Sequence, residues 1–316
     1  MIVLADTPAT FAAVGVHGTS RRIGSDDVPP FLQDAWRRLA ERPDSDAWVG
    51  MVDSPHTAIT PGRALIAVER ARGSQFAALQ EALRSGADLP DDLACIALEG
   101  DGFRGQRGRS WSALRGNLHA CLVARVDIPA VASQSVLTAL PAVATVRAIE
   151  RASGGRVRPG IKWVNDIMLA GHKIGGVISA TQVIAERVSH VLIGIGVNVH
   201  QAPQVARDPR VAPAGSLDEL AGEAAPALTP LTVALLEELD RAVAEVRASD
   251  GGALIEAYRR RSLVVGRRVA VWPVTDAEHA GEPRWTGTVR ALRDDLSLEL
   301  MEHEAVVSSG RLTLLD

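Results

Sequence analysis

The sequence predicts an α+β fold in two parts, and three observations lead to that prediction. From residue 64 onward, segments with helical and with strand-like hydrophobic patterns alternate. Strand-like segments then follow one another at 160–199, which favours a sheet of largely antiparallel and mixed strands backed by helices. After about residue 263 the pattern changes to short strands separated by turn residues.

Residues 1–62 form an N-terminal extension whose role the sequence does not reveal. Within it, residues 28–42 are expected to form a helix, because Asp26 and Asp27 precede it and a proline pair stands at its start. No second and third helix followed by a wing is recognisable, so a DNA-binding winged helix is not expected.

The second segment, residues 63–262, begins with a regular alternation of elements. Residues 63–71 are expected to form a strand, and residues 74–86 a helix capped by Ser74. Two further strands are predicted at 93–98 and 116–126.

The centre of the chain contains one long helix and a group of strands. Residues 130–152 have a helical pattern that includes Pro141. Strand-like segments follow at 160–169, 173–183 and 189–199, and a tight turn joins the first two.

The remaining segments complete the two parts. Residues 201–228 are expected to be a loop with one short helix. A helix is predicted to begin at Thr229, as its N-cap, and to run to about Ala248, and another spans 253–261. The spacing of short strands in residues 263–316 predicts a small β-barrel.

In composition the chain is an ordinary globular protein, with 316 residues, 47% hydrophobic residues and a net charge of −4. That charge argues against non-specific nucleic-acid binding, which needs a basic surface. Cys95 and Cys121 stand in apolar runs and are expected to be buried free thiols in a reducing compartment. The N-terminus is a poor signal peptide, and no apolar run reaches the ~18 residues of a membrane-spanning helix, so a cytoplasmic location is expected.

The segment "FRGQRGRSW" at 103–111 concentrates three arginines and two glycines between two predicted strands. It is interpreted either as a basic surface loop or as a loop that closes over an anion, since arginine makes bidentate contacts to phosphate and carboxylate. Trp111 at its end is expected either to pack in the core or to cover a ligand ring.

A second group of polar residues lies in "KWVND" and "KIGGV". In an extended hairpin, Asn165, Asp166 and Lys173 are expected to lie near one another. A carboxylate and an amide suit Mg²⁺ or a ribose, and a lysine suits a carboxylate or an α-phosphate. The alternative is a surface hairpin in which the pair formed by Lys162 and Asp166 contributes little.

The motifs "GFRGQRGRSW", "KWVND", "KIGGV" and "GIGVNV" together resemble, in order and approximate spacing, the catalytic domain of biotin protein ligases, within the biotin/lipoate protein ligase superfamily. The resemblance covers residues 63–200, and the β-rich tail resembles that family's SH3-like C-terminal domain. It implies a two-step ligase that uses ATP and Mg²⁺. Biotin first condenses with ATP to biotinyl-AMP, and is then transferred to a lysine of the biotin carboxyl carrier domain of a carboxylase.

The resemblance also implies roles for individual residues. It assigns catalysis to Lys173, Arg107 and Asp166. Substrate binding is assigned to Ser74, Gln75, Asp101, Arg104, Gln106, Arg109, Trp111, Gly116, Asn117, Gly175 and Gly176. Nucleotide binding is assigned to Lys162, Asn165, Asp166 and Asn198, with Asp166 also the candidate Mg²⁺ ligand.

The sequence departs from the family pattern mainly where the acid is expected to bind. Ser74 and Gln75 stand where the family has a Ser-Thr-Asn triplet, and Asp101 stands where it has a glutamine. Gln106 removes one arginine from the loop, which should weaken adenylate retention, and Asp101 is unfavourable unless a cation or a bound donor balances it.

These departures leave two alternatives open. One is a ligase for a different acid such as lipoate, and the other is a non-catalytic paralogue that senses the ligand. A homodimer is possible, and neither DNA nor a membrane is expected as a partner.

Overall fold

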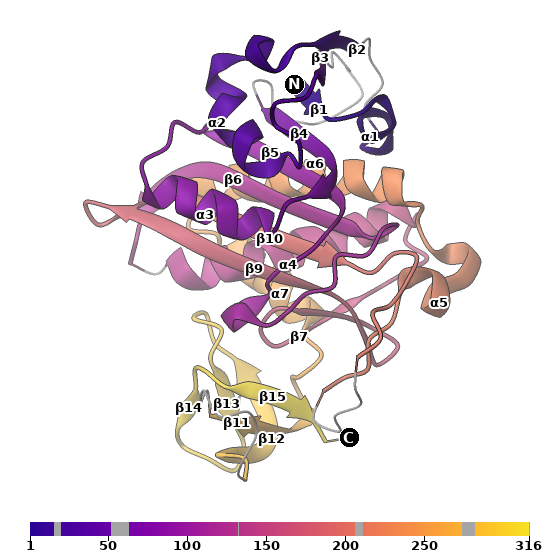
Figure 1. Cartoon of the computed structure of the whole chain (residues 1–316). Helices are drawn as coiled ribbons and strands as arrows, with labels where there is room; N and C mark the ends of the chain where they lie inside the picture. Colours follow the sequence, from indigo (N-terminus) through magenta and orange to yellow (C-terminus); the bar gives the residue numbers. More distant parts are fainter. Residues whose placement is uncertain (16–19, 52–62, 132, 206–210, 274–281, 316) are drawn as a thin grey trace.

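The fold is taken from a computed structural model that describes residues 1–15, 20–51, 63–131, 133–205, 211–273 and 282–315. Within these ranges most strands belong to one large mixed sheet (Figure 1). Its ten strands lie in the order β2 (Ser20–Ile23), β3 (Ala47–Met51), β1 (Ile2–Ala5), β4 (Ala64–Ala71), β5 (Asp92–Gly100), β6 (Leu118–Pro129), β10 (Arg187–Val197), β9 (His172–Ile184), β8 (Asp166–Leu169) and β7 (Gly160–Lys162).

The N-terminal extension contributes to this same sheet. Strand β1 pairs in parallel with β4, and β4 pairs in parallel with β5, whereas the other neighbouring strands of the large sheet are antiparallel. Helix α1 (Pro8–Ala13) and helix α2 (Pro30–Leu39) connect the first strands. The predicted helix at 28–42 is therefore confirmed, with slightly shorter bounds.

Helices cover both faces of the large sheet. On one face lie α4 (Ser133–Ala152), α6 (Leu228–Ala248) and α7 (Gly252–Arg261), which pack together (Figure 1). On the other lie α2 and α3 (Gln75–Arg84), in front of the central strands. The predicted mixed sheet backed by helices is confirmed.

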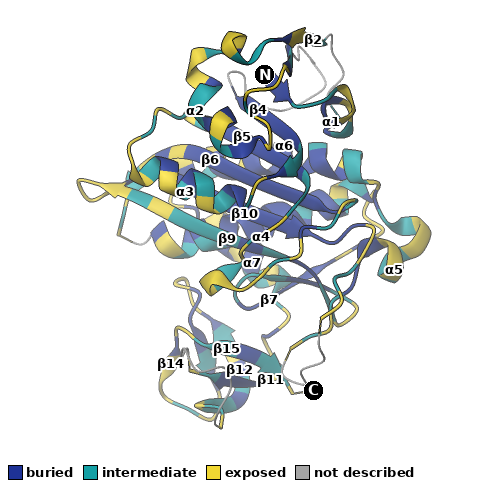
Figure 2. Cartoon of the chain, in the orientation of Figure 1, coloured by how far each residue is buried: buried dark blue, intermediate teal, exposed yellow. Residues whose placement is uncertain are grey.

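Alternate residues of strand β10 face the two layers, as strand geometry requires. Val191 and Ile193 belong to the hydrophobic core shared with α4 and α6, whereas Leu192 belongs to the core shared with α2 and α3. In Figure 2 the central strands are almost entirely buried. Beyond the register shift between Val188 and His190, the even-numbered positions of β10 from Leu192 onward therefore face the α3 layer.

The last strands form a separate small antiparallel sheet. Its order is β14 (Val306–Val307), β13 (Leu298–Leu300), β12 (Trp285–Leu292), β11 (Arg268–Trp272) and β15 (Arg311–Leu314). The short elements outside the two sheets are α5 (Leu217–Ala221) and the 3₁₀ helices η1 (Ser25–Asp27), η2 (Gln106–Gly108) and η3 (Gly222–Ala224). None of the described helices is both long and apolar enough to cross a membrane.

Two local predictions were wrong. Helix α6 begins at Leu228 without a side-chain cap, because the Thr229 hydroxyl instead donates to the Ala13 carbonyl of the N-terminal segment, at 3.0 Å. The single strand predicted at 160–169 is split into β7 and β8 by a turn, in which the Trp163 indole donates to the Leu296 carbonyl at 2.7 Å. In both cases a tertiary contact overrides a local preference.

The two cysteines are buried and free, as predicted. Cys95 on β5 and Cys121 on β6 lie opposite each other in the antiparallel pairing of these strands. Burial raises the pKa of both thiols, so each remains protonated at neutral pH.

Candidate active site

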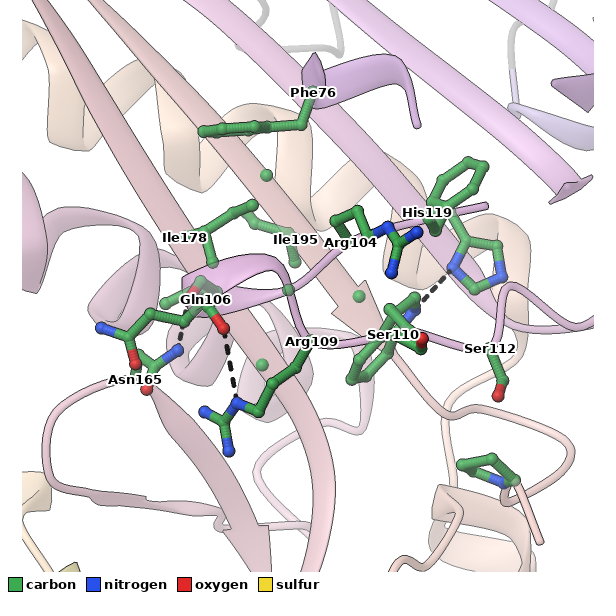
Figure 3. Close-up of a pocket in the computed structure, with 18 of the residues that line it drawn as sticks. Phe76, Arg104, Gln106, Arg109, Ser110, Ser112, His119, Asn165, Ile178 and Ile195 are labelled. Atoms are coloured by element: carbon green, nitrogen blue, oxygen red, sulfur yellow. Dashed lines mark hydrogen bonds between the residues drawn. The ribbon is translucent and has the colours of Figure 1, made fainter. Parts of the chain in front are cut away.

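A cavity of about 360 Å³ lies on the face of the large sheet that α3 covers (Figure 3). Three central strands supply its floor, through residues of β6, β9 and β10. The start of α3 supplies one wall, and the arginine-rich segment at 103–111 supplies another. The cavity thus joins four predicted motifs that are separated in the sequence.

Glycines keep the floor of the cavity open. Gly194 and Gly196 on β10 and Gly176 on β9 lack the side chains that would otherwise project toward α3. An ideal Cβ on Gly196 would lie 2.4 Å from the Trp111 ring, and one on Gly194 would lie 2.9 Å from Phe76. The glycines at these two positions are therefore required by the close approach of aromatic rings.

One end of the cavity combines apolar walls with a free amide. Phe76 and Ile178 both lie against Gly194, since an ideal Cβ there would be 2.9 Å from each side chain, and Figure 3 shows the two side chains in the same part of the cavity. Gln75 is only 2% exposed, and neither atom of its amide has a hydrogen-bond partner among the described residues. Because an unpaired buried amide is costly, Gln75 is prepared to bind a ligand that offers both a donor and an acceptor.

The neighbouring Ser74 has a different task. Its hydroxyl accepts a hydrogen bond from the Ala77 amide at 3.4 Å and so caps helix α3. The predicted cap is confirmed, and Ser74 also lines the cavity.

At another part of the cavity wall, two lysines share one carboxylate. Lys173 Nζ lies 2.5 Å from Asp166 Oδ1, and Lys162 Nζ lies 3.4 Å from Asp166 Oδ2. Lys173 lines the cavity, whereas Lys162 and Asp166 are not among its lining residues. Asp166 and Lys173 therefore lie close together, as expected from the sequence.

Burial and charge oppose each other at this carboxylate. Burial acts to raise the pKa of Asp166, but the ammonium groups of Lys173 and Lys162 outweigh it and hold that pKa below its ordinary value. Burial lowers the pKa of Lys162, and Asp166 counteracts this. Asp166 therefore remains ionised and fixes the ammonium group of Lys173 at the cavity.

Asn165 and Asn198 line the cavity, and each is held in place by a backbone carbonyl. The Asn165 amide donates to the Val177 carbonyl at 2.8 Å, and the Asn198 amide donates to the Gly215 carbonyl at 3.0 Å. The side-chain oxygen of Asn198 is buried without a partner, which leaves it available as an acceptor.

The arginine-rich segment folds back on itself over the cavity. The Trp111 amide donates to the Phe103 carbonyl at 3.0 Å, and the Gly105 amide donates to the Arg109 carbonyl at 2.7 Å. Arg104, Gln106 and Arg109 line the cavity (Figure 3). Of the two interpretations made from the sequence, this arrangement favours a loop that covers a ligand.

Arg107 occupies the tip of this loop. Its backbone is left-handed, with φ +61°, and its side chain is exposed. Arg107 is not among the described residues that line the cavity. The structure therefore brings Arg104 and Arg109 to the cavity, and not Arg107.

Three other residues that were predicted to bind substrate do not line the cavity but lie in the structure around it. They are Asn117, Gly116 and Gly175. The Asn117 amide is fully used: its oxygen accepts from three backbone amides at 199–201, and its nitrogen donates to the Gln201 carbonyl. Gly116 forms a turn with φ +87° against His200. An ideal Cβ on Gly175 would lie 2.8 Å from the Gly196 carbonyl, so this glycine permits close strand pairing.

Asp101 lies on the surface, outside the lining of the cavity. Its side chain is 80% exposed and forms an ion pair with Arg70. Arg70, on the neighbouring strand β4, is thus a cation that balances this carboxylate.

Replacing Asp101 with asparagine is expected to change the affinity for the acid substrate by less than about threefold, because a solvent-exposed ion pair outside the cavity contributes little. Calorimetric titration of the variant with biotin measures this. A tenfold change in affinity would show that Asp101 acts on the ligand directly.

His119 and Phe76 are among the residues of the cavity that were not predicted from the sequence. His119 on β6 is 1% exposed, and burial lowers its pKa from 6.5 to about 4, so the imidazole is neutral at pH 7. Phe76 follows Gln75 and covers Gly194. The available signal for His119 was a single polar residue in the apolar run "LHACLVA".

The pKa of His119 predicts a pH dependence of stability. The unfolded chain binds more protons than the folded protein between pH 6.5 and about 4, so the free energy of unfolding falls as the pH drops through this window. The lowered pKa of His119 changes the free energy of unfolding by roughly 3 kcal/mol across this window. Urea unfolding of the protein and of His119→Gln at several pH values should show a shallower pH dependence in the variant, and parallel curves would contradict the assignment.

The predicted Mg²⁺ ligand lacks companions. Among the described residues, no group of three or more His, Cys, Asp or Glu side chains could hold a metal ion. Both oxygens of Asp166 face ammonium groups. By themselves, the described residues around Asp166 therefore do not complete a metal site.

Comparison with known proteins identifies similar sequences. The model of the "Biotin/lipoate A/B protein ligase family" matches residues 74–198. The biotin--[acetyl-CoA-carboxylase] ligase of Mycobacterium tuberculosis is 33% identical over 247 residues, which cover 75% of this chain and 84% of that protein. The bifunctional ligase/repressor BirA of Bacillus subtilis is 38% identical over 137 residues, covering 43% of this chain and 41% of the relative, so the match spans about two fifths of that protein's length.

Solved structures share the fold. A biotin protein ligase from Aquifex aeolicus in complex with biotin and ATP superposes with a TM-score of 0.61 at 18% identity, covering 81% of this chain and 99% of that one. A biotin protein ligase from Leishmania major in complex with biotin gives a TM-score of 0.51 at 18% identity, with the same coverage.

Proposed function

The chain belongs to the biotin protein ligase family, and from this premise we propose that it condenses biotin with ATP and transfers the biotinyl group to a lysine of a carboxylase carrier domain. One observation carries the proposal. A single cavity joins the unpartnered amide of Gln75 to the ammonium group of Lys173, so one bound acid can be held at both its polar ends. The name of the Mycobacterium tuberculosis relative supports biotin and a carboxylase, and the ligands of the Aquifex aeolicus structure support ATP.

The ring end of biotin fits the chemistry near Gln75. A cyclic urea presents N–H donors and a carbonyl acceptor, and the Gln75 amide offers the complementary acceptor and donor. Phe76, Ile178 and Trp111 supply apolar surface for the remaining ring atoms and the alkyl chain. A volume of about 360 Å³ lies within the range of small-molecule sites.

In the first step, a carboxylate oxygen of biotin attacks the α-phosphorus of ATP. The bond between that phosphorus and the bridging oxygen breaks, and pyrophosphate leaves. Lys173 reduces the repulsion between the two anions and stabilises the charge that develops in the transition state. Asp166 is a positioning residue in this scheme, because it acts through Lys173.

The loop and the nucleotide contacts complete the first step. Arg104 and Arg109 bind carboxylate or phosphate oxygens and exclude water from the adenylate. Lys162, Asn165 and Asn198 remain the proposed nucleotide contacts. Arg107 remains a proposed catalytic residue, at the exposed tip of the loop and not among the described residues that line the cavity.

In the second step, the uncharged amine of the acceptor lysine attacks the acyl carbon of biotinyl-AMP. An amide bond forms, the acyl–phosphate bond breaks, and AMP leaves while the amine loses a proton to solvent. The name of the Mycobacterium tuberculosis relative supports a carboxylase as the source of the acceptor.

The finer predictions about organisation remain proposals. They are a division into segments 1–62, 63–262 and 263–316, an SH3-like barrel for the small C-terminal sheet, a cytoplasmic location and a homodimer. The antiparallel order β14–β13–β12–β11–β15 supports the barrel proposal.

The chemistry of Gln75 favours biotin over lipoate. The dithiolane ring of lipoate has no hydrogen-bond donor, so it would leave the Gln75 carbonyl oxygen unpaired in a buried position. The ligand-sensing alternative predicts binding without turnover.

Transfer to a purified carrier domain tests the whole proposal. With ATP and biotin, mass spectrometry should detect one biotinyl group on the acceptor lysine. When lipoate replaces biotin, it should detect no lipoyl group. Attachment of lipoate, or binding of biotin without any transfer, would overturn the proposed function.

A further inference from the structure

His119 lies beneath the arginine-rich loop, in contact with both of its ends. Its Nε2 lies 3.1 Å from the Leu114 carbonyl, which can only accept, so Nε2 carries the proton of the neutral ring. Its Nδ1 is then an acceptor, and it lies 3.5 Å from Nε1 of Trp111, which can only donate. The two contacts therefore select a single tautomer.

The second end of the loop meets the same imidazole. The Phe103 ring packs edge-on against it, with centroids 5.8 Å apart and an interplanar angle of 63°. Phe103 and Trp111 are the residues on either side of Arg104–Ser110, and the Trp111 amide closes this neck by donating to the Phe103 carbonyl. His119 thus contacts both residues of the neck, and Figure 3 shows it beside the loop.

The orientation of the Trp111 indole determines the shape of the cavity next to Lys173. The indole lies directly over Gly196, where an ideal Cβ would be 2.4 Å from the ring. An ideal Cβ on Gly176 would lie 3.7 Å from the same ring and 3.5 Å from Lys173 Nζ. Trp111 and Lys173 are therefore neighbours across a single glycine.

We infer that His119 is a positioning residue that fixes the Trp111 indole and the neck of the arginine-rich loop, and thereby holds the loop closed over the adenylate. The inference rests on the proposed function for the identity of the ligand. The hydrogen bond to Trp111 is long at 3.5 Å, and it can shorten when the indole settles against a bound ligand.

Two substitutions separate the two hydrogen bonds of His119. The amide of asparagine reaches the level of Nδ1 and can accept from Trp111, whereas the amide of glutamine reaches the level of Nε2 and can donate only to the Leu114 carbonyl. His119→Gln is expected to raise the dissociation rate of biotinyl-AMP about three- to tenfold, which is the loss of one hydrogen bond. His119→Asn should stay within about twofold.

A double-mutant cycle with Trp111→Phe shows whether the effect passes through the indole. In the Trp111→Phe background, His119→Gln should have no further effect on dissociation. Equal effects of His119→Gln and His119→Asn, or an undiminished effect of His119→Gln without Trp111, would overturn the inference. Should His119→Gln fail to fold, Trp111→Phe removes the same bond from the donor side and should raise the dissociation rate similarly.

Trp111 fluorescence tests the inference without any reaction. The emission of Trp111, obtained as the difference between each protein and its Trp111→Phe counterpart, should change in His119→Gln and remain unchanged in His119→Asn. An unchanged emission in His119→Gln would overturn the positioning role. A protein that forms no biotinyl-AMP contradicts the proposed function alone, since the fluorescence result stands independently.

Discussion

Replacing Lys173 with alanine is expected to lower the rate of biotin-dependent adenylation by ~10²–10³-fold, which is the usual loss when one preorganised charge contact to a transition state is removed. Lys173 is the ammonium group that both lines the cavity and contacts Asp166. Exchange of labelled pyrophosphate into ATP measures the effect, with circular dichroism to establish that the variant is folded.

Lys162→Met is the comparison variant for this prediction, and Lys162 is itself a proposed nucleotide contact. This substitution removes an ammonium group from the same carboxylate, but one that does not line the cavity. A smaller loss is therefore expected than for Lys173→Ala. If the folded Lys173→Ala protein exchanged pyrophosphate at nearly the native rate, Lys173 would have no part in the chemistry.

Gly196→Ala is expected to weaken biotin binding by about fivefold to 150-fold. Its Cβ would lie 2.4 Å from the Trp111 ring, so the indole must move out of the cavity wall. Overpacking of this kind costs ~1–3 kcal/mol, which converts to that range of affinity. Isothermal titration calorimetry with biotin measures the change.

Gly176→Ala is the control for this substitution, because it adds the same methyl group to the residue paired with Gly196. Its Cβ would lie 3.4 Å or more from every neighbouring atom, an ordinary contact. It should weaken binding much less than Gly196→Ala. Equal losses for the two variants would mean that the Trp111 wall does not determine affinity.

The sequence predicted the elements of the fold better than their long-range pairing. The strand at 63–71, the helix at 74–86 and its Ser74 cap follow from local periodicity and capping, and the structure has them. The parallel pairing of residues 2–5 with β4 joins segments some sixty residues apart, for which the local pattern carries no signal. Thr229 failed as a cap because a distant carbonyl, that of Ala13, takes its hydroxyl.

At the site, motif spacing predicted where the lysines and the loop lie, but it did not predict which hydrogen-bond partners each polar side chain has. Lys173 and Asp166 were expected to be neighbours and are. That Gln75 lacks partners while Asn117 uses every polar atom of its amide depends on the packing around each residue. The partner of Asp101 is Arg70, which lies outside all four motifs.

The central claim is that one cavity binds biotin and brings its carboxylate to Lys173 for reaction with ATP. Pyrophosphate exchange with ATP, measured with the unmodified protein and a panel of carboxylic acids, tests it most directly. The account predicts exchange that saturates with biotin and is absent with lipoate. Exchange supported by lipoate alone, or no exchange with any acid by a protein that binds biotin, would contradict it.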